Sequence, residues 1–127
     1  MGAFLWVCAG SALGGGARYL LTRLMLQEAS AFSWAVFSAN ILGCFLIGAF
    51  TACFIKFELA NEFRLFLSLG LLGGFTTFSS FSLEALQLLK TQAYGHAIFY
   101  VFASTIFGIA ACAIAFCLFS RIFSLTA

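Results

Sequence analysis

Long apolar segments that alternate with short polar linkers organise this chain. Four segments are dominated by apolar side chains, and they cover residues 4–26, 33–55, 63–89 and 97–119. Each exceeds the roughly 20 residues that an α-helix needs to cross the hydrocarbon core of a bilayer. The linkers between them, QEASAF, KFELANE and KTQAYGH, leave no room for a soluble domain. The pattern therefore predicts one all-α membrane domain, residues 1–127, with four transmembrane helices and both termini on the same side.

The third apolar segment is interrupted at its centre by the sequence GGFTTFSSFS, residues 73–82. This stretch carries no charge, but it is rich in hydroxyl groups. Hydrocarbon offers backbone groups no water, so irregular or polar backbone at membrane depth is tolerated only where it is buried in protein or lines a polar path. The chain contains no proline, and we therefore attribute the break to Gly73 and Gly74. The segment predicts a third helix that is broken near the membrane midplane and serves transport.

The composition restricts the class of protein. Hydrophobic residues make up 64% of the chain and charged residues only 8%, and the mean hydropathy is +1.12. A soluble domain of this size has too little interior to hide so much apolar surface, so we expect a multi-pass membrane protein surrounded by lipid. The net charge is +2 and the basic residues are scattered, which argues against a nucleic-acid partner.

The reactive side chains form no catalytic or metal-binding pattern. The five cysteines lie within apolar segments and show no CxxC spacing, so we interpret them as small packing residues. The only histidine, His96, is in a linker, and no serine has an obvious base beside it. We therefore expect that the protein is not an enzyme.

Polar side chains within the four segments gather at one level. If the side that holds both termini is called A and the other side B, most of these residues lie at the centre or in the B half; they are Arg18, Asn40, Thr76, Ser79, Ser80, Ser82, Glu84, Tyr100, Ser104 and Thr105. Glu84 and Tyr100 can also be explained as interfacial residues. One protomer would thus provide a polar path through half of the bilayer, and a second, inverted protomer would provide the other half.

The basic residues give no preferred orientation. The 6 Lys and Arg residues divide evenly, with Lys56, Arg64 and Arg121 on side A and Arg18, Arg23 and Lys90 on side B. The positive-inside rule then selects neither orientation. The simplest account is dual topology with an antiparallel homodimer; the alternative is that one loop dominates and the tie is accidental.

The polar groups suit a small anion. Hydroxyl groups and the Asn40 amide can donate hydrogen bonds to a dehydrated anion. Phe78 and Phe81 can present electropositive ring edges, while a helix N-terminus after the break and Arg18 add positive potential. Each feature has a structural alternative, because phenylalanines pack, hydroxyls bond to their own helix and an arginine snorkels to the interface. Backbone carbonyls freed at the break suit a cation instead.

Three stretches of the chain resemble a known family. GGFTTFSSFSLE is similar to the hallmark segment of the small fluoride-channel family, called Fluc or CrcB. GGGARYLL and SANILGCFLIG resemble that family's first- and second-span motifs, so the resemblance covers essentially the whole chain. Members are antiparallel, dual-topology dimers with two fluoride pores and a central sodium ion, and the resemblance implies the same architecture here.

The resemblance also implies roles for individual residues. The fluoride path would be lined by Asn40, Phe78, Phe81, Ser79, Ser80, Tyr100 and Ser104. Arg18 would lie near the vestibule, and the backbone carbonyls of Gly73 and Thr76 from both protomers would hold the sodium ion. Gly108 stands where the family can place a further serine, so the deep end of the polar track departs from the family pattern.

The expected function is a fluoride-selective channel in the inner membrane of a bacterial cell, which exports fluoride passively and relieves its toxicity. Two other classes of protein match parts of the pattern. Small dual-topology, proton-coupled multidrug carriers resemble the chain in size and number of spans, but they rely on a membrane-embedded glutamate in the first span, which is absent here. A non-transporting assembly subunit would need neither Asn40 nor a hydroxyl-rich break.

Overall fold

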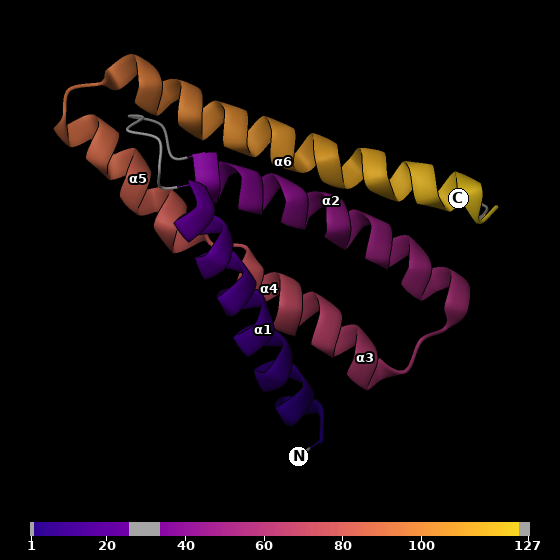
Figure 1. Ribbon diagram of the computed structural model, residues 1–127. Helices are drawn as coiled ribbons and strands as arrows, with labels where there is room; N and C mark the ends of the chain where they lie inside the picture. The colour runs from indigo at the N-terminus through magenta and orange to yellow at the C-terminus, as the bar shows by residue number, and fades with distance from the viewer. Residues whose placement is uncertain (1, 26–33, 125–127) are drawn as a thin grey trace.

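The computed structural model describes residues 2–25 and 34–124, and every regular element within these ranges is a helix (Figure 1). The elements are α1 (Gly2–Met25), α2 (Trp34–Phe57), α3 (Asn61–Leu65), the π-helix η1 (Phe66–Leu72), α4 (Gly73–Phe75), α5 (Phe78–Lys90) and α6 (Tyr94–Ile122). The all-α fold class is confirmed. Residues 26–33, which include the first predicted linker, lie outside the described residues.

Three stretches of the described chain are long and apolar enough to cross a membrane: Trp34–Phe57, Asn61–Lys90 and Tyr94–Ile122. They coincide with the second, third and fourth predicted spans. The helix α1 also has a suitable length, at 24 residues, but the sequence GGGAR dilutes its apolar content, and α1 is not among the three. The chain is therefore a helical membrane protein with three membrane-capable helical segments in its described part.

The helices pack as two pairs that are not neighbours in sequence. The helices α2 and α6 run side by side over most of their length, and α1 crosses η1 and α4 (Figure 1). Beyond the break, α5 leaves α1 and packs against α6. The break thus allows the third span to change its neighbour halfway along.

A seam of four glycines joins α1 to the first half of the third span. A methyl group added to Gly70 would lie 2.9 Å from the Cα atom of Gly10, and one added to Gly74 would lie 2.6 Å from the carbonyl oxygen of Ser11. Gly14 is equally close to the facing backbone. Small residues spaced four apart allow such backbone contact in membrane helices, and here the two GxxxG pairs face each other.

The position of the break corrects our prediction about its cause. Gly73 has helical dihedral angles, with φ −63° and ψ −35°, and the helix continues through Phe75. The chain becomes extended at Thr76, where ψ is 156°, and at Thr77, where φ is −153° and ψ is 119°. The prediction that glycine breaks the helix was wrong, because Gly74 serves the close contact with α1 instead.

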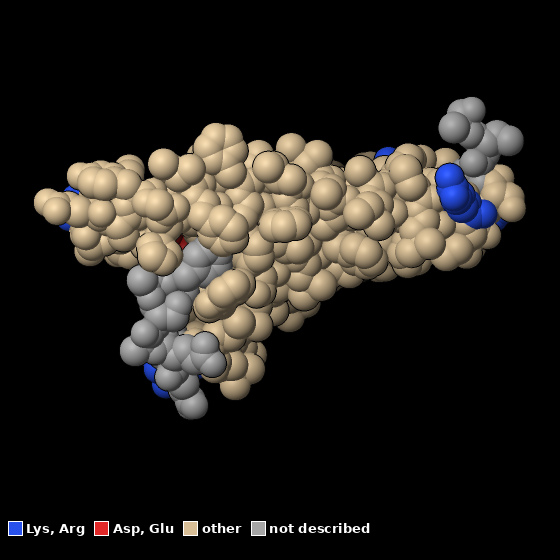
Figure 2. Space-filling model, turned by 90° about the horizontal axis from the view of Figure 1, so that it is seen from above, with Lys and Arg blue, Asp and Glu red and all other residues tan. Residues whose placement is uncertain are grey.

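The interior is small and the outer surface is apolar. Among the described residues, most buried apolar residues are alanines, and the largest side chain that is fully buried is Tyr100. Large apolar side chains remain open along the described helices; Leu24, for example, is 76% exposed. Lys and Arg lie toward the two ends of the face seen in Figure 2, with other residue types between them. Such a surface is stable only against lipid or another protein chain.

Candidate functional site

Two extended residues, Thr76 and Thr77, form the break, and the hydroxyl of Thr77 organises the helix that follows. Its Oγ1 atom accepts a hydrogen bond from the backbone N–H of Ser80 at 3.2 Å, which makes Thr77 the N-cap of α5. The same oxygen lies 3.1 Å from the hydroxyl of Ser79 and 3.2 Å from that of Ser80. The three hydroxyls therefore form one cluster at the positive end of α5.

Side chains from α1 and α2 bind the backbone on both sides of the break. The Nδ2 group of Asn40 donates to the carbonyl of Thr77 at 3.1 Å, and the N–H of Thr77 donates to Oδ1 of Asn40 at 2.8 Å. From the opposite side, the Nε group of Arg18 donates to the carbonyl of Gly74 at 3.2 Å. The cost of an amide in hydrocarbon is thus reduced by two hydrogen bonds with the backbone of one residue, Thr77.

Because of these contacts, two carbonyl groups lose the N–H donors that they would have in a continuous helix. The carbonyl of Gly73 would there accept from the N–H of Thr77, which bonds to Asn40 instead. The carbonyl of Thr76 would accept from the N–H of Ser80, which bonds to the hydroxyl of Thr77. Both oxygens are therefore released from the helical hydrogen-bond pattern.

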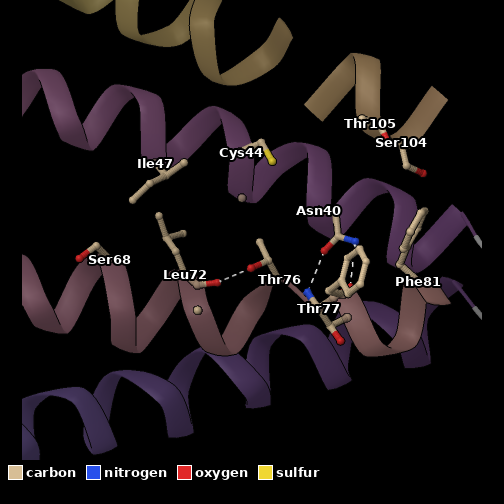
Figure 3. Close-up of a pocket in the computed structure, with 13 residues that line it drawn as sticks. Asn40, Cys44, Ile47, Ser68, Leu72, Thr76, Thr77, Phe81, Ser104 and Thr105 are labelled. Atoms are coloured by element: carbon tan, nitrogen blue, oxygen red, sulfur yellow. Dashed lines mark hydrogen bonds between the residues drawn. The ribbon is translucent and has the colours of Figure 1, made fainter. Parts of the chain in front are cut away.

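A cavity of about 390 Å³ lies beside the break, between α2, the third span and α6 (Figure 3). The residues that line it are Asn40, Gly43, Cys44, Ile47, Ser68, Leu72, Gly73, Thr76, Thr77, Phe78, Phe81, Ser104 and Thr105. Apolar carbons form most of the wall, and a few amide, hydroxyl and backbone groups converge on it. This combination is typical of a site for a small ligand.

Three aromatic rings form one wall next to the cavity. The rings of Phe78 and Phe81 have centroids 5.5 Å apart, and Phe81 stacks on Tyr100 at 5.2 Å with an interplanar angle of 29°. Tyr100 therefore covers one face of the Phe81 ring, and Phe81 also lines the cavity. The Tyr100 hydroxyl donates to Oε2 of Glu84 at 2.5 Å.

The sequence did not predict the hydrogen bond between Tyr100 and Glu84. A position at the membrane interface was considered as an alternative explanation for both residues. A signal was present, because a lone acid within an apolar segment needs a donor nearby. The pattern could not name that donor, since Tyr100 lies in a different helix.

The hydroxyl groups around the cavity differ in their partners. Those of Ser68 and Thr105 donate to carbonyls of their own helices, at 2.7 Å and 2.8 Å. The hydroxyl oxygen of Ser104 is buried and has no hydrogen-bond partner among the described residues. A methyl group added to Gly108, one turn further, would lie 3.4 Å from the sulfur of Cys44. The thiol of Cys44 therefore takes up the space beside Gly108 at this end of the cavity.

The structure thus brings six of the predicted site residues to one cavity: Asn40, Gly73, Thr76, Phe78, Phe81 and Ser104. The other predicted residues are not among those that line it. Ser79 and Ser80 belong to the hydroxyl cluster of Thr77, Tyr100 lies behind Phe81, and Arg18 holds the far side of the break. Within the described residues no group of three or more His, Cys, Asp or Glu side chains could hold a metal ion.

Comparison with known proteins matches this chain to one family. A family model described as "CrcB-like protein, Camphor Resistance (CrcB)" matches residues 5–116. A "Fluoride-specific ion channel FluC" from Phocaeicola vulgatus is 44% identical over 110 residues, which cover 86% of this chain and 91% of the relative. Proteins of the same name from Helicobacter pylori strain P12 and Helicobacter acinonychis strain Sheeba are each 40% identical, and they cover 83% and 87% of this chain and 83% and 90% of their own lengths.

Proposed function

The chain belongs to the CrcB family, and we propose that it forms a fluoride-selective channel through which fluoride leaves the cytoplasm passively. It is accordingly a transport protein and not an enzyme. The observation that carries the proposal is the break at Thr76–Thr77, which joins the residues most specific to the family motif to a cavity with a few polar groups. The relatives named as fluoride channels match the chain across this segment.

The chemistry of the cavity supports a small, strongly hydrated anion. The amide of Asn40 has a second N–H besides the one bound to Thr77, and the Ser104 hydroxyl donates to no other group in the part of the chain that the structure describes. The edges of Phe78 and Phe81 supply weak positive potential without a full charge. Donors of this kind replace water around an anion without trapping it in an ion pair.

An antiparallel dimer of four-span protomers completes the proposed channel. Phe78 lines the cavity and yet is 80% exposed in the single chain, so a partner protomer would cover it. The even division of basic residues permits both orientations in the membrane. We place α1 as the fourth span, because its seam of glycines packs it along the first half of the third span.

A sodium ion between the two protomers is part of the same proposal. The carbonyls of Gly73 and Thr76 would hold it, and their release from helical hydrogen bonds leaves hard oxygen ligands available, as such a cation requires. The ion would supply a fixed positive charge and a link between protomers. The residues of this chain orient its ligands and exclude lipid from them.

The setting we propose is the inner membrane of a bacterial cell. Hydrogen fluoride crosses membranes as a neutral acid and dissociates inside, which leaves the anion trapped. A passive path suffices for export, since moving one charge through a potential of 100 mV is worth about 2.3 kcal/mol.

Efflux from liposomes tests the proposal. The purified protein is reconstituted in potassium-loaded vesicles, valinomycin is added, and fluoride release is followed with a fluoride electrode, with chloride as the parallel control. We expect rapid release of fluoride and not of chloride, and loss of release in Phe81→Ile. No release from folded dimers would refute the proposal and favour the multidrug carrier or the assembly subunit.

A further inference from the structure

We propose that Asn40, and not the residues of the break, keeps the third span broken and thereby leaves the Gly73 carbonyl free for a cation. Asn40 would then be a positioning residue, which acts through Thr77 in addition to any contact with the ion. The role of the cation rests on the proposed function, whereas the effect on the backbone does not.

Nothing in the local chain forces the break. The chain has no proline, and no glycine among the described residues has a positive φ angle. Gly73 and Gly74 are helical, and a helical turn is accessible to Thr76 and Thr77 at a modest cost in propensity. An isolated segment of this sequence would therefore be free to form one continuous helix.

Apart from the N-cap bond of the Thr77 hydroxyl, the contacts that oppose a continuous helix come from other helices. Asn40 binds both the N–H and the carbonyl of Thr77, at 2.8 Å and 3.1 Å. Its amide oxygen takes the place of the Gly73 carbonyl that the N–H of Thr77 gives up, and its N–H adds a bond to the carbonyl of Thr77, the N-cap of α5. Arg18 occupies the carbonyl of Gly74 at 3.2 Å, which in a continuous helix would accept from the N–H of Phe78.

The surface of α2 next to Asn40 is also shaped for the break. Gly43 follows Asn40 by three positions and so lies on the same helix face. A methyl group added to Gly43 would collide with the Cγ2 methyl group of Thr76. The helix α2 therefore accepts the extended Thr76 closely at the point where Asn40 holds Thr77 (Figure 3).

Removal of the Asn40 side chain would leave the N–H of Thr77 unpaired at membrane depth, where such a group costs several kcal/mol. The nearest repair is the helical bond from the N–H of Thr77 to the carbonyl of Gly73. That bond would close the break and consume one of the two carbonyls proposed to hold sodium. Asn40 thus decides whether the Gly73 carbonyl points into a helix or to a ligand.

Carbon-13 NMR of threonine-labelled protein in bilayers tests this directly, because the Cα and Cβ shifts separate extended from helical threonines. Thr22, Thr51 and Thr105 lie within helices and serve as internal references. In the wild type we expect extended shifts for Thr76 and Thr77. In Asn40→Ala both should move to the helical range, whereas Asn40→Asp keeps an acceptor for the Thr77 N–H and should leave them extended. Folded Asn40→Ala with both threonines extended would overturn the proposal.

If Asn40→Ala does not fold, Asn40→Asp decides alone, since helical shifts there would overturn the proposal and extended shifts would support it.

Sodium provides an independent readout. The Tm should rise with sodium in the wild type and in Asn40→Asp, and the rise should be lost in Asn40→Ala. Thr51→Ala is the matched control in α2, because its exposed hydroxyl bonds only to its own helix. A wild type without a sodium effect would refute the proposed cation, while the threonine shifts would still decide the role of Asn40.

Discussion

The run Gly14–Gly15–Gly16 allows a sharp test of the seam between α1 and the third span. A methyl group at Gly14 would lie 2.8 Å from the backbone nitrogen of Phe75 and 2.9 Å from the carbonyl carbon of Leu71, whereas one at Gly15 or Gly16 meets nothing within 4 Å in the single chain. The neighbours of Gly14 are backbone atoms, which cannot rotate aside as a side chain would. Gly14→Ala must therefore force the two helices apart by several tenths of an ångström.

The expected magnitude is a balance of two effects. Overpacking of this kind costs about 1–3 kcal/mol, and replacing glycine by alanine in a helix returns about 1 kcal/mol. Gly14→Ala should therefore lose up to about 2 kcal/mol of stability, whereas Gly15→Ala and Gly16→Ala should lose none. Thermal unfolding in one detergent, followed by intrinsic fluorescence, would show a Tm several degrees lower for Gly14→Ala alone. Equal Tm values for Gly14→Ala and Gly15→Ala would refute the account of the seam.

Three further changes test the site. Phe78→Ile should abolish fluoride efflux from liposomes while dimers still form, because an alkyl side chain has no electropositive edge; wild-type efflux would remove this residue from the pathway. Tyr100→Phe should lower the free energy of unfolding by about 1–3 kcal/mol, since it leaves the Glu84 carboxylate without its donor, and Glu84→Gln, which keeps an acceptor, should cost less in the same denaturation assay. Ser104→Ala should leave Tm unchanged or higher, because the buried hydroxyl has no partner among the described residues, and should slow efflux. Ser120→Ala, which removes another such hydroxyl away from the cavity, should leave efflux unchanged, and equal efflux in both serine variants would count against a role for Ser104.

The pattern of apolar residues was sufficient for the helices but not for their contacts. The predicted spans at 33–55 and 97–119 correspond to α2 and α6, because a run of apolar residues determines where helix can cross lipid. The need of Asn40 for a partner was also predictable from the cost of a lone amide in hydrocarbon. The identity of that partner was not, because Thr77 lies on a separate helix and only packing brings the two together.

The break was also predictable only in part. Its approximate place was evident from the polar sequence, but its cause was misassigned to Gly73 and Gly74. Local sequence offers glycine as the obvious helix breaker, whereas in the fold Gly74 packs against α1 and a side chain 37 positions away holds Thr77. Contacts between distant segments decide such details, and a single sequence does not display them.

The pairing of α1 with η1 and of α2 with α6 has a consequence for biogenesis. Chains are synthesised from the N-terminus, so neither of the first two helices finds its main partner when it enters the membrane. The helix α1 can pack against its partner only after the first half of the third span has been made, and α2 only after the whole of α6 has been made. The nascent chain therefore passes through stages in which small-residue faces are open to lipid or to other membrane proteins. The break, which depends on α1 and α2 together, takes its final form only after these late pairings are complete.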